Sequence, residues 1–396
     1  MKKKKNRIIK FPTWPAVEKD EIQAVNRVLK STKWNYWTGE EGREFEKEFG
    51  KVAGCIYAVA VANGSLALEL ALYALDIGDG DDVIVTSRSF IASVSCVLMR
   101  NANPIFSDVD AISQNVTVDT IRAVLTPNTK AIVVVHLAGW SCDMDPIIEL
   151  AESLDIKIIE DCAQAHGAMY KDRPVGSLGH VAAFSFCQDK IISTGGEGGM
   201  LTTNDENIWR KAWSFKDHGK SYNAVYNKKH PPGYRWLHES FGTNWRLTEI
   251  QSVIGRVALK KLPQWVRRRR QNALILDNCF SEFDIVRVPI PKKEIYHSYY
   301  KYYIFVYPEK LKSGWDRNRI MQTISEDGVP CFNTYGGEVY LEKAFKKAGL
   351  RPHKRLPVAK KLGETCIQFL VHPTLSDKEM YYTCEKVSNV LNMASR

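Results

Sequence analysis

The sequence of 396 residues predicts an α/β protein, in which a mostly parallel central sheet carries helices on both faces and a smaller α+β domain follows. Two observations predict this fold class. Between about residues 55 and 205, short apolar runs alternate with amphipathic segments, as is typical of βα units around a buried parallel sheet. Further along, aromatic, strand-like residues at Tyr299–Tyr307 are followed by amphipathic segments near Asp316–Glu326 and Asp377–Leu391.

The expected elements follow in order, each strand with the helical segment after it: YAVAVA with SLALELALYAL, DVIVT with FIASVSCVLM, NPIFSDV with VDTIRAVL, KAIVVVH with PIIELAESL, and a last strand, IKIIED. The strands are short and apolar, whereas the helical segments are longer and amphipathic. A long helical pattern at Leu247–Asp277, interrupted only by Pro263, leads out of the sheet. The expected domains are therefore 1–262, with an N-terminal arm over 1–20, and 263–396.

Composition excludes several classes of protein. The N-terminus lacks the apolar core of a signal peptide, and no apolar run is long enough to cross a bilayer, so a cytoplasmic protein without a membrane partner is expected. The nine cysteines form no CxxC pair and no metal-ligand spacing. We expect reduced core thiols and no metal site.

The net charge of +10 raises the question of nucleic-acid binding. Much of it comes from two local runs, Lys2–Lys5 and Arg267–Arg270. Four consecutive arginines spread around a helix instead of forming one stripe. We therefore expect a solvated tail and a solvated helix face and no nucleic-acid partner, although a basic surface would also suit an anionic small substrate.

Polar residues follow three of the expected strands, and ligands of such sheets bind beyond the carboxyl ends of the strands. The first group is Asn63-Gly64-Ser65, which opens the segment SLALEL. A small turn at a helix start directs free N–H groups outward and can bind phosphate. The alternative is that Asn63 or Ser65 only caps the helix.

The second group begins with Asp161, directly after the strand IKIIE. A carboxylate at the mouth of a buried strand is costly unless a cation faces it. A metal ion, a salt bridge or a protonated heterocycle could each serve. Gln164 and His166 lie close enough in sequence to point into the same crevice.

The third group contains Lys190, in the loop after the expected strand AAFSF, whose alternation Ser185 and Cys187 continue. The glycines after it, in TGGEGG, allow positive φ angles and close approach of the backbone to a ligand. A lone lysine in a loop is usually solvated. Here, however, a phosphate site, a buried acid and a lysine fall at one edge of the same sheet.

Together the three groups suggest pyridoxal phosphate. Its phosphate would bind at Gly64-Ser65, its aldehyde would react with Lys190, and Asp161 would keep the ring nitrogen protonated so that the ring can accept electrons. Phe90, after the strand DVIVT, could stack on the ring, and a core phenylalanine is the alternative.

The chain resembles, from about residue 11 to its C-terminus, the DegT/DnrJ/EryC1/StrS family of pyridoxal-phosphate-dependent sugar aminotransferases, which have fold type I of the aspartate aminotransferase superfamily. The motifs that carry the resemblance are GREFEKEFGKVAG, VANGSLALELALYAL, DVIVTSRSFIASVSCVL, IIEDCAQAHGA, FSFCQDK, GGEGGMLTTND and TNWRLTEIQSVIGRVALKKL. The resemblance implies a fold-type I transferase with a smaller C-terminal domain.

The resemblance also implies residue roles. Lys190 is expected to be the catalytic lysine and Asp161 the partner of the ring nitrogen. The remaining cofactor-binding residues expected are Gln164 near the phenolic oxygen, Gly64, Ser65 and Ser185 at the phosphate, Phe90, and Asn244 donated by the neighbouring subunit. The last assignment implies a homodimer with shared active sites, whereas a helix start is the alternative for Asn244. Substrate contacts are expected from Tyr36, Thr38, Gly39 and Lys301.

Two positions depart from many members of the family: Ile191 follows the lysine, and Lys301 stands where a histidine is common. A solvated lysine on a strand is the alternative for Lys301. Relatives that remove a hydroxyl group carry histidine in place of the cofactor lysine, so Lys190 favours transamination.

The expected reaction moves an amino group from L-glutamate, through pyridoxamine phosphate, to the keto group of a nucleotide-linked 4-keto-6-deoxy sugar, leaving 2-oxoglutarate. The product would serve surface polysaccharide, lipopolysaccharide O-antigen or a glycosylated natural product. Alternatives are a 3-keto-sugar or keto-cyclitol aminotransferase, a dehydratase-like branch, or a catalytically silent regulator that binds pyridoxal phosphate.

Overall fold

A computed structural model describes residues 9–333 and 337–396. The expected solvated tail Lys2–Lys5 lies outside these residues, as do residues 334–336. The helices are α1 Lys19–Ser31, α2 Glu41–Val52, α3 Gly64–Ala74, α4 Ala92–Met99, α5 Val118–Arg122, α6 Met144–Ser153, α7 Glu206–Phe215, α8 Tyr222–Tyr226, α9 Glu249–Phe280, α10 Arg317–Glu326, α11 Lys343–Lys347, α12 Pro357–Thr365 and α13 Asp377–Ala394. The strands are β1 Tyr57–Val61, β2 Asp82–Thr86, β3 Asn103–Ser107, β4 Thr129–Val135, β5 Lys157–Asp161, β6 Met169–Tyr170, β7 Arg173–Pro174, β8 Val181–Ser185, β9 Gly199–Thr203, β10 Val286–Arg287, β11 Ile295–Tyr296, β12 Tyr302–Val306, β13 Cys331–Phe332 and β14 Cys366–Phe369.

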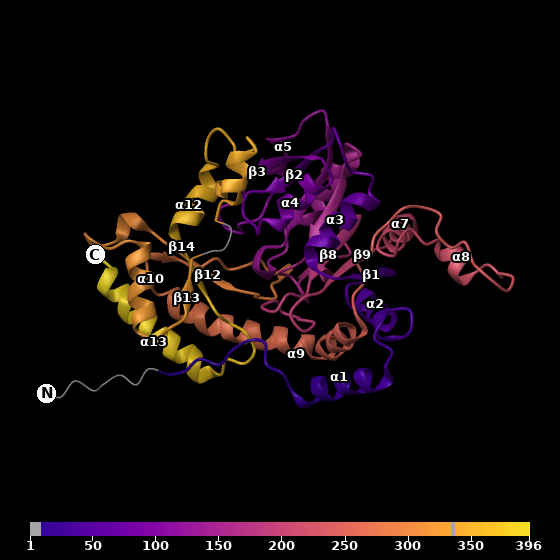
Figure 1. The fold of residues 1–396 in the computed structure, drawn as a ribbon. Coiled ribbons are helices and arrows are strands. Elements are labelled where there is room, and N and C mark those ends of the chain that lie inside the picture. Colours follow the sequence, from indigo (N-terminus) through magenta and orange to yellow (C-terminus); the bar gives the residue numbers. More distant parts are fainter. Residues whose placement is uncertain (1–8, 334–336) are drawn as a thin grey trace.

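The central sheet has seven strands in the order β1-β9-β8-β5-β4-β2-β3 (Figure 1). The pairs β2·β3, β2·β4, β4·β5 and β5·β8 are parallel, whereas β9 runs antiparallel to both of its neighbours, β1 and β8. Since β1 and β8 both oppose β9, they run in the same direction as each other. The prediction of a mostly parallel sheet is confirmed.

Helices cover both faces of this sheet. On one face, α3, α4 and α7 bury apolar side chains against alternate strand residues such as Val85 and Ile159. On the other face, α2 and α9 cover β1 and β8, and α5 and α6 cover β2, β4 and β5. Side chains on both faces of these strands pack against helices, so the strand sequences are continuous apolar runs.

A second, antiparallel sheet with the order β10-β12-β14-β13 packs with α10, α13 and the end of α9. This arrangement confirms the expected smaller α+β part. The expected long helix is present as α9, whose 32 residues continue through Pro263 (Figure 1). The predicted boundary after residue 262 therefore falls inside a helix, and the exact division into domains stays a prediction.

The expectation of a solvated arginine run on α9 is wrong. Of the four arginines only Arg267 is exposed, and Arg269 is 1% exposed. The guanidinium of Arg268 donates to the carbonyl oxygen of Leu375, and that of Arg270 donates to the carbonyl oxygen of His297. Segments of the second half of the chain pack over this part of α9, which the helical pattern alone does not reveal.

All nine cysteines are free thiols, and seven of them are buried as expected, whereas Cys187 and Cys279 are half-buried. Among the residues that the structure describes, no helix combines the length and the apolar character needed to cross a bilayer.

Candidate active site

The carboxyl ends of β1, β5 and β8 lie at the same edge of the central sheet, because these three strands run in one direction. Asp161, the last residue of β5, lies opposite Ala183 of β8. Ser185 ends β8 two residues later. The structure therefore brings the second and third predicted groups to adjacent strand ends.

The first group joins them through a close contact. A Cβ atom at Gly64 would lie 2.5 Å from Cβ of Ser185, so only glycine allows α3 to start this close to β8. Asn63 caps α3 by accepting a hydrogen bond from the amide of Leu66, as the alternative interpretation expected. Because the cap satisfies Leu66, the N–H groups of Gly64 and Ser65 remain as donors at the helix start.

The Asp161 carboxylate is 4% exposed. Its Oδ2 accepts a hydrogen bond of 2.6 Å from Ser93 Oγ, and its Oδ1 accepts one of 3.0 Å from the amide of Ala163. Within residues 9–333 and 337–396, no lysine, arginine or histidine forms an ion pair with it. Since an ionised carboxylate has about four acceptor positions, this buried acid retains room for a cationic donor.

Lys190 lies in the loop after β8, and its side chain is half-buried. Its carbonyl oxygen accepts a hydrogen bond of 2.8 Å from the indole of Trp14, in the N-terminal arm. Its Nζ lies 4.8 Å from the ring centroid of Tyr300. Two segments far away in sequence thus position this loop.

Tyr300 connects Lys190 to a second lysine. Its hydroxyl donates a short hydrogen bond to the Asp189 carboxylate, and Lys301 Nζ also lies 4.8 Å from its ring centroid. Lys301 Nζ is 4.0 Å from Asp189, and its side chain is 17% exposed, so the solvated alternative for Lys301 is wrong. Burial lowers the pKa of Lys301, and the nearby charges of Arg269 and Lys190 lower it further, against the effect of Asp189.

Arg269 adds a third cation. One terminal nitrogen donates to the carbonyl oxygens of Tyr299 and Tyr300, each at 3.3 Å. Within the described part of the chain, its Nε and other terminal nitrogen have no acceptor. Burial lowers the pKa of Arg269. Arg269 and Lys301 therefore both interact with one exposed anion, Asp189, and this excess of positive charge suits an anionic ligand.

Phe90, Gln164 and His166, which were also predicted to lie near the cofactor or Asp161, have different environments. Phe90 is 59% exposed, so the alternative of a core phenylalanine is wrong. Gln164 Oε1 accepts a hydrogen bond from the amide of Ala138. His166 is buried against the rings of Phe184 and Phe186, on the side of β8 opposite to Ser185, and does not join Asp161. Burial, together with the charges of Lys190 and Arg269, lowers the pKa of His166 to about 3.

The other expected ligand residues lie on other elements. Tyr36 is buried, with its hydroxyl donating to Glu46 of α2, and Gly39 lies against Glu249 at the start of α9. Thr38 is exposed. Asn244 is exposed and its backbone pairs with Asp217. Thr248 caps α9, so Asn244 is not the start of that helix.

Sequence reasoning missed Trp14, Tyr300 and Arg269. The aromatic cluster HSYYKYYIF could have directed attention to Tyr300, because it surrounds Lys301. No local signal distinguishes Trp14 or Arg269, since their neighbours come from distant segments.

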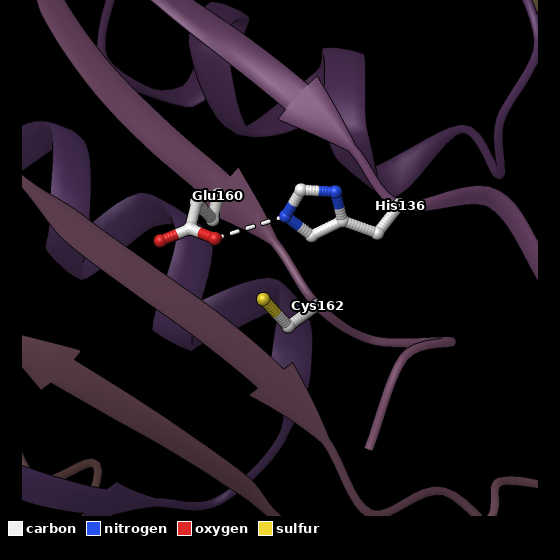
Figure 2. A group of neighbouring side chains, drawn as sticks. All are labelled: His136, Glu160 and Cys162. Atoms are coloured by element: carbon white, nitrogen blue, oxygen red, sulfur yellow. Dashed lines mark hydrogen bonds and ion pairs between the residues drawn. The ribbon is translucent and has the colours of Figure 1, made fainter. Parts of the chain in front are cut away.

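Among the residues that the structure describes, one side-chain cluster has the composition of a metal site: His136, Glu160 and Cys162, all buried (Figure 2). The polar atoms of His136 and Glu160, however, already have partners. His136 Nδ1 accepts a hydrogen bond of 3.0 Å from the amide of Cys142, and Nε2 lies 2.9 Å from Glu160. A neutral imidazole with its proton on Nε2 satisfies both contacts, so hydrogen bonding accounts for the cluster.

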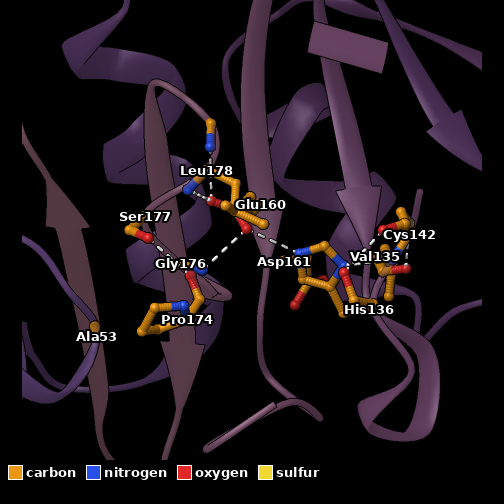
Figure 3. A network of polar contacts seen from close by, with 12 residues as sticks. Ala53, Val135, His136, Cys142, Glu160, Asp161, Pro174, Gly176, Ser177 and Leu178 are labelled. Atoms are coloured by element: carbon orange, nitrogen blue, oxygen red, sulfur yellow. Dashed lines mark hydrogen bonds and ion pairs between the residues drawn. The ribbon is translucent and has the colours of Figure 1, made fainter. Parts of the chain in front are cut away.

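Glu160 is the centre of this network (Figure 3). Besides His136, its carboxylate accepts hydrogen bonds from the amides of Gly176, Leu178 and Gly179, at 2.7–2.9 Å. Burial raises the pKa of Glu160, but the hydrogen bonds from His136 and the amides outweigh it, so the net pKa is lowered. The network fixes the turn before β8 against β5.

Comparison with known proteins supplies a family. The sequence model of the DegT/DnrJ/EryC1/StrS aminotransferase family matches residues 15–388. A GDP-perosamine synthase of Escherichia coli O157:H7 is 34% identical over 374 residues, which cover 94% of this chain and 96% of that protein.

Two solved structures are similar to this chain over most of its length. The crystal structure of an aminotransferase from Psychrobacter cryohalolentis has 54% identity and a TM-score of 0.95, covering 97% of this chain and 99% of the other. The Streptococcus pneumoniae protein named "Putative sugar aminotransferase Spr1654", in its PMP form, has 25% identity and a TM-score of 0.86, covering 96% of this chain and 98% of the other.

Glu160→Gln is expected to lower the free energy of unfolding by about 3 kcal/mol, because the amides and His136 would lose an anionic acceptor. Urea unfolding measures the change. Because the folded pKa is lowered, the difference from wild type should be full above the unfolded carboxyl pKa of about 4.3 and fade as the pH falls below it. The exposed Glu152 provides the control Glu152→Gln, and equal unfolding midpoints for the two variants would contradict the role of this network.

Proposed function

This chain belongs to the DegT/DnrJ/EryC1/StrS aminotransferase family, and we propose that it moves an amino group from L-glutamate to the keto group of a nucleotide-linked sugar. Members of the family are aminotransferases that use pyridoxal phosphate. The strongest support is the buried Asp161, which has no ion-pair partner among the described residues and ends a strand beside the one that leads to Lys190.

The residues at this edge fit the cofactor. Asp161 offers a buried carboxylate with unused acceptor positions to the ring nitrogen. The N–H groups of Gly64 and Ser65, with the hydroxyl of Ser185, would bind the phosphate at the positive end of α3. Phe90, which is exposed beside this edge, would stack on the ring, and Gln164 would lie near its phenolic oxygen.

Pyridoxal phosphate supplies an aldehyde that takes up the amino group and a ring that accepts electrons. Lys190 would hold the cofactor covalently until the donor displaces it. Its freed amine would then take the proton from Cα of the donor and deliver it to the carbon that was the cofactor's aldehyde. Tyr300 and the Trp14 hydrogen bond would keep this amine within reach of both carbon atoms. The second half of the reaction uses the same lysine in reverse.

The cations beside Lys190 would bind anionic parts of the two substrates. Lys301 and Arg269 carry more positive charge than Asp189 neutralises, and Arg269 has two nitrogens without an acceptor among the described residues. Carboxylates of L-glutamate and phosphates of a sugar nucleotide are both suitable partners. The expected contacts of Tyr36, Thr38 and Gly39 with the substrate remain proposals.

We infer a homodimer in which Asn244 reaches the phosphate of the neighbouring subunit's cofactor. The support comes from the segment before Asn244, which projects beyond α7 and α8 (Figure 1). It exposes three large apolar side chains, Tyr234, Trp236 and Phe241, the last being 96% exposed. Exposed aromatic clusters of this kind mark protein interfaces.

The proposed acceptor is a 4-keto-6-deoxy sugar on a nucleoside diphosphate, used for surface polysaccharide such as O-antigen or for a glycosylated natural product. Similarity to a protein named GDP-perosamine synthase favours GDP as the nucleotide of the acceptor. A 3-keto sugar or a keto-cyclitol remains the second choice. A panel of keto-sugar nucleotides, assayed for 2-oxoglutarate formation, distinguishes these acceptors.

Lys190→Ala is expected to reduce 2-oxoglutarate formation from L-glutamate by about 1000-fold, because it removes both the covalent link and the proton carrier. The variant should still bind pyridoxal phosphate non-covalently through α3 and Asp161. Borohydride reduction followed by peptide mass mapping should label residue 190 only in the wild type.

The matched control is Lys378→Ala, which removes an exposed lysine of α13. Near-normal turnover by Lys190→Ala, or a borohydride label on another lysine, would refute the assignment.

Lys301→Met is expected to raise the KM of an anionic substrate about tenfold, which corresponds to about 1.4 kcal/mol, with a smaller change in kcat. Lys301→Arg keeps the charge and should retain most of the affinity. Separate KM values for L-glutamate and the sugar nucleotide would identify which anion Lys301 binds, and two unchanged KM values would show that it binds neither.

A further inference from the structure

Two cysteines meet between α9 and α13, away from Lys190. On α9, Ile275 and Cys279 are four residues apart, and on α13, Cys384 and Ser388 are four residues apart, so each pair lies on one helix face. These two faces contact each other. The two sulfur atoms therefore lie in the same helix–helix seam.

Each cysteine contacts residues of the opposite helix. Cys279 Sγ lies 3.2 Å from Ser388 Oγ and 3.9 Å from the carbonyl oxygen of Cys384. Cys384 Sγ lies 3.7 Å from the carbonyl oxygen of Ile275. Each thiol thus approaches a backbone carbonyl of the other helix, while no metal-ligand group joins them among the residues with described positions.

The two thiols are chemically unequal. A hydrogen bond with the Cys384 thiol lowers the pKa of Cys279 to about 7, although burial opposes it, and Ser388 adds a further hydrogen bond. The same interaction, together with burial, raises the pKa of Cys384. By contrast, burial raises the pKa of Cys366 to about 11. Cys279 is half-buried, so solvent and small reagents can reach it.

We propose that Cys279 and Cys384 are a site of reversible oxidation, at which a hydroperoxide converts the two thiols into a disulfide that links α9 to α13. The site is independent of the proposed substrate. α9 also carries Arg269, ten residues before Cys279. The disulfide would therefore link the helix that carries Arg269 to α13.

The chemistry balances with the hydroperoxide as oxidant. The Cys279 thiolate attacks the terminal peroxide oxygen, the O–O bond breaks, and water or an alcohol leaves, which gives a sulfenic acid. The Cys384 sulfur then attacks the Cys279 sulfur, the S–O bond breaks, and the hydroxyl leaves as water with the thiol proton. In total, the two thiols lose two electrons and two protons, and the peroxide gains them. A dithiol reverses the change.

The test treats the full-length holoenzyme with hydrogen peroxide, blocks the remaining thiols with N-ethylmaleimide, and maps unreduced peptides by mass spectrometry. The expected result is a peptide pair joining Cys279 and Cys384, lighter by two hydrogen atoms, with maleimide labelling of both thiols lost together and restored by dithiothreitol. In Cys384→Ser the sulfenic acid of Cys279 should persist, and dimedone should label it where the wild type shows no label.

Cys187→Ser is the matched control, because Cys187 is the other half-buried cysteine, and the Cys279–Cys384 pair should form in it as in the wild type. Three results would overturn the proposal: both thiols remaining free after peroxide, Cys279 joined to a different cysteine, or equal dimedone labelling of wild type and Cys384→Ser.

Discussion

The proposed site depends on one electrostatic constraint, a carboxylate buried at the end of a sheet strand and not paired with a cation among residues 9–333 and 337–396. The Asp161 side chain is 4% exposed, and its two hydrogen bonds, from Ser93 and Ala163, come from neutral groups. Burying such a charge is costly unless a cationic donor faces it. In the proposed assignment, a protonated ring nitrogen of pyridoxal phosphate would meet this need at the carboxyl end of β5.

The other proposed site residues come together because chain segments that are distant in sequence pack against the loop after β8 and the start of α3. The start of α3 touches β8 through Gly64 and Ser185. Trp14, from the N-terminal arm, holds the backbone of Lys190, and Tyr300, from the second half of the chain, lies beside its side chain. The proposed cofactor site therefore draws its residues from several distant parts of the chain.

The features of the fold and the site that could be predicted from the sequence are those that depend on short, local patterns of residues. Apolar runs predicted the parallel sheet, and a parallel sheet brings strand ends together, so Asp161 and Ser185 could be placed in advance. The burial of Arg269 and Lys301 could not, because it results from packing by segments that are distant in sequence. The same limit explains why the arginine run was expected to be solvated and why Trp14 was missed.

A crystal structure of the protein with pyridoxal phosphate tests the central claim most directly. The account predicts continuous density between Lys190 Nζ and the cofactor, with the ring nitrogen within hydrogen-bonding distance of an Asp161 oxygen. Cofactor density away from this strand edge, or an Asp161 carboxylate that contacts only Ser93 and Ala163 while the cofactor is bound, would contradict it.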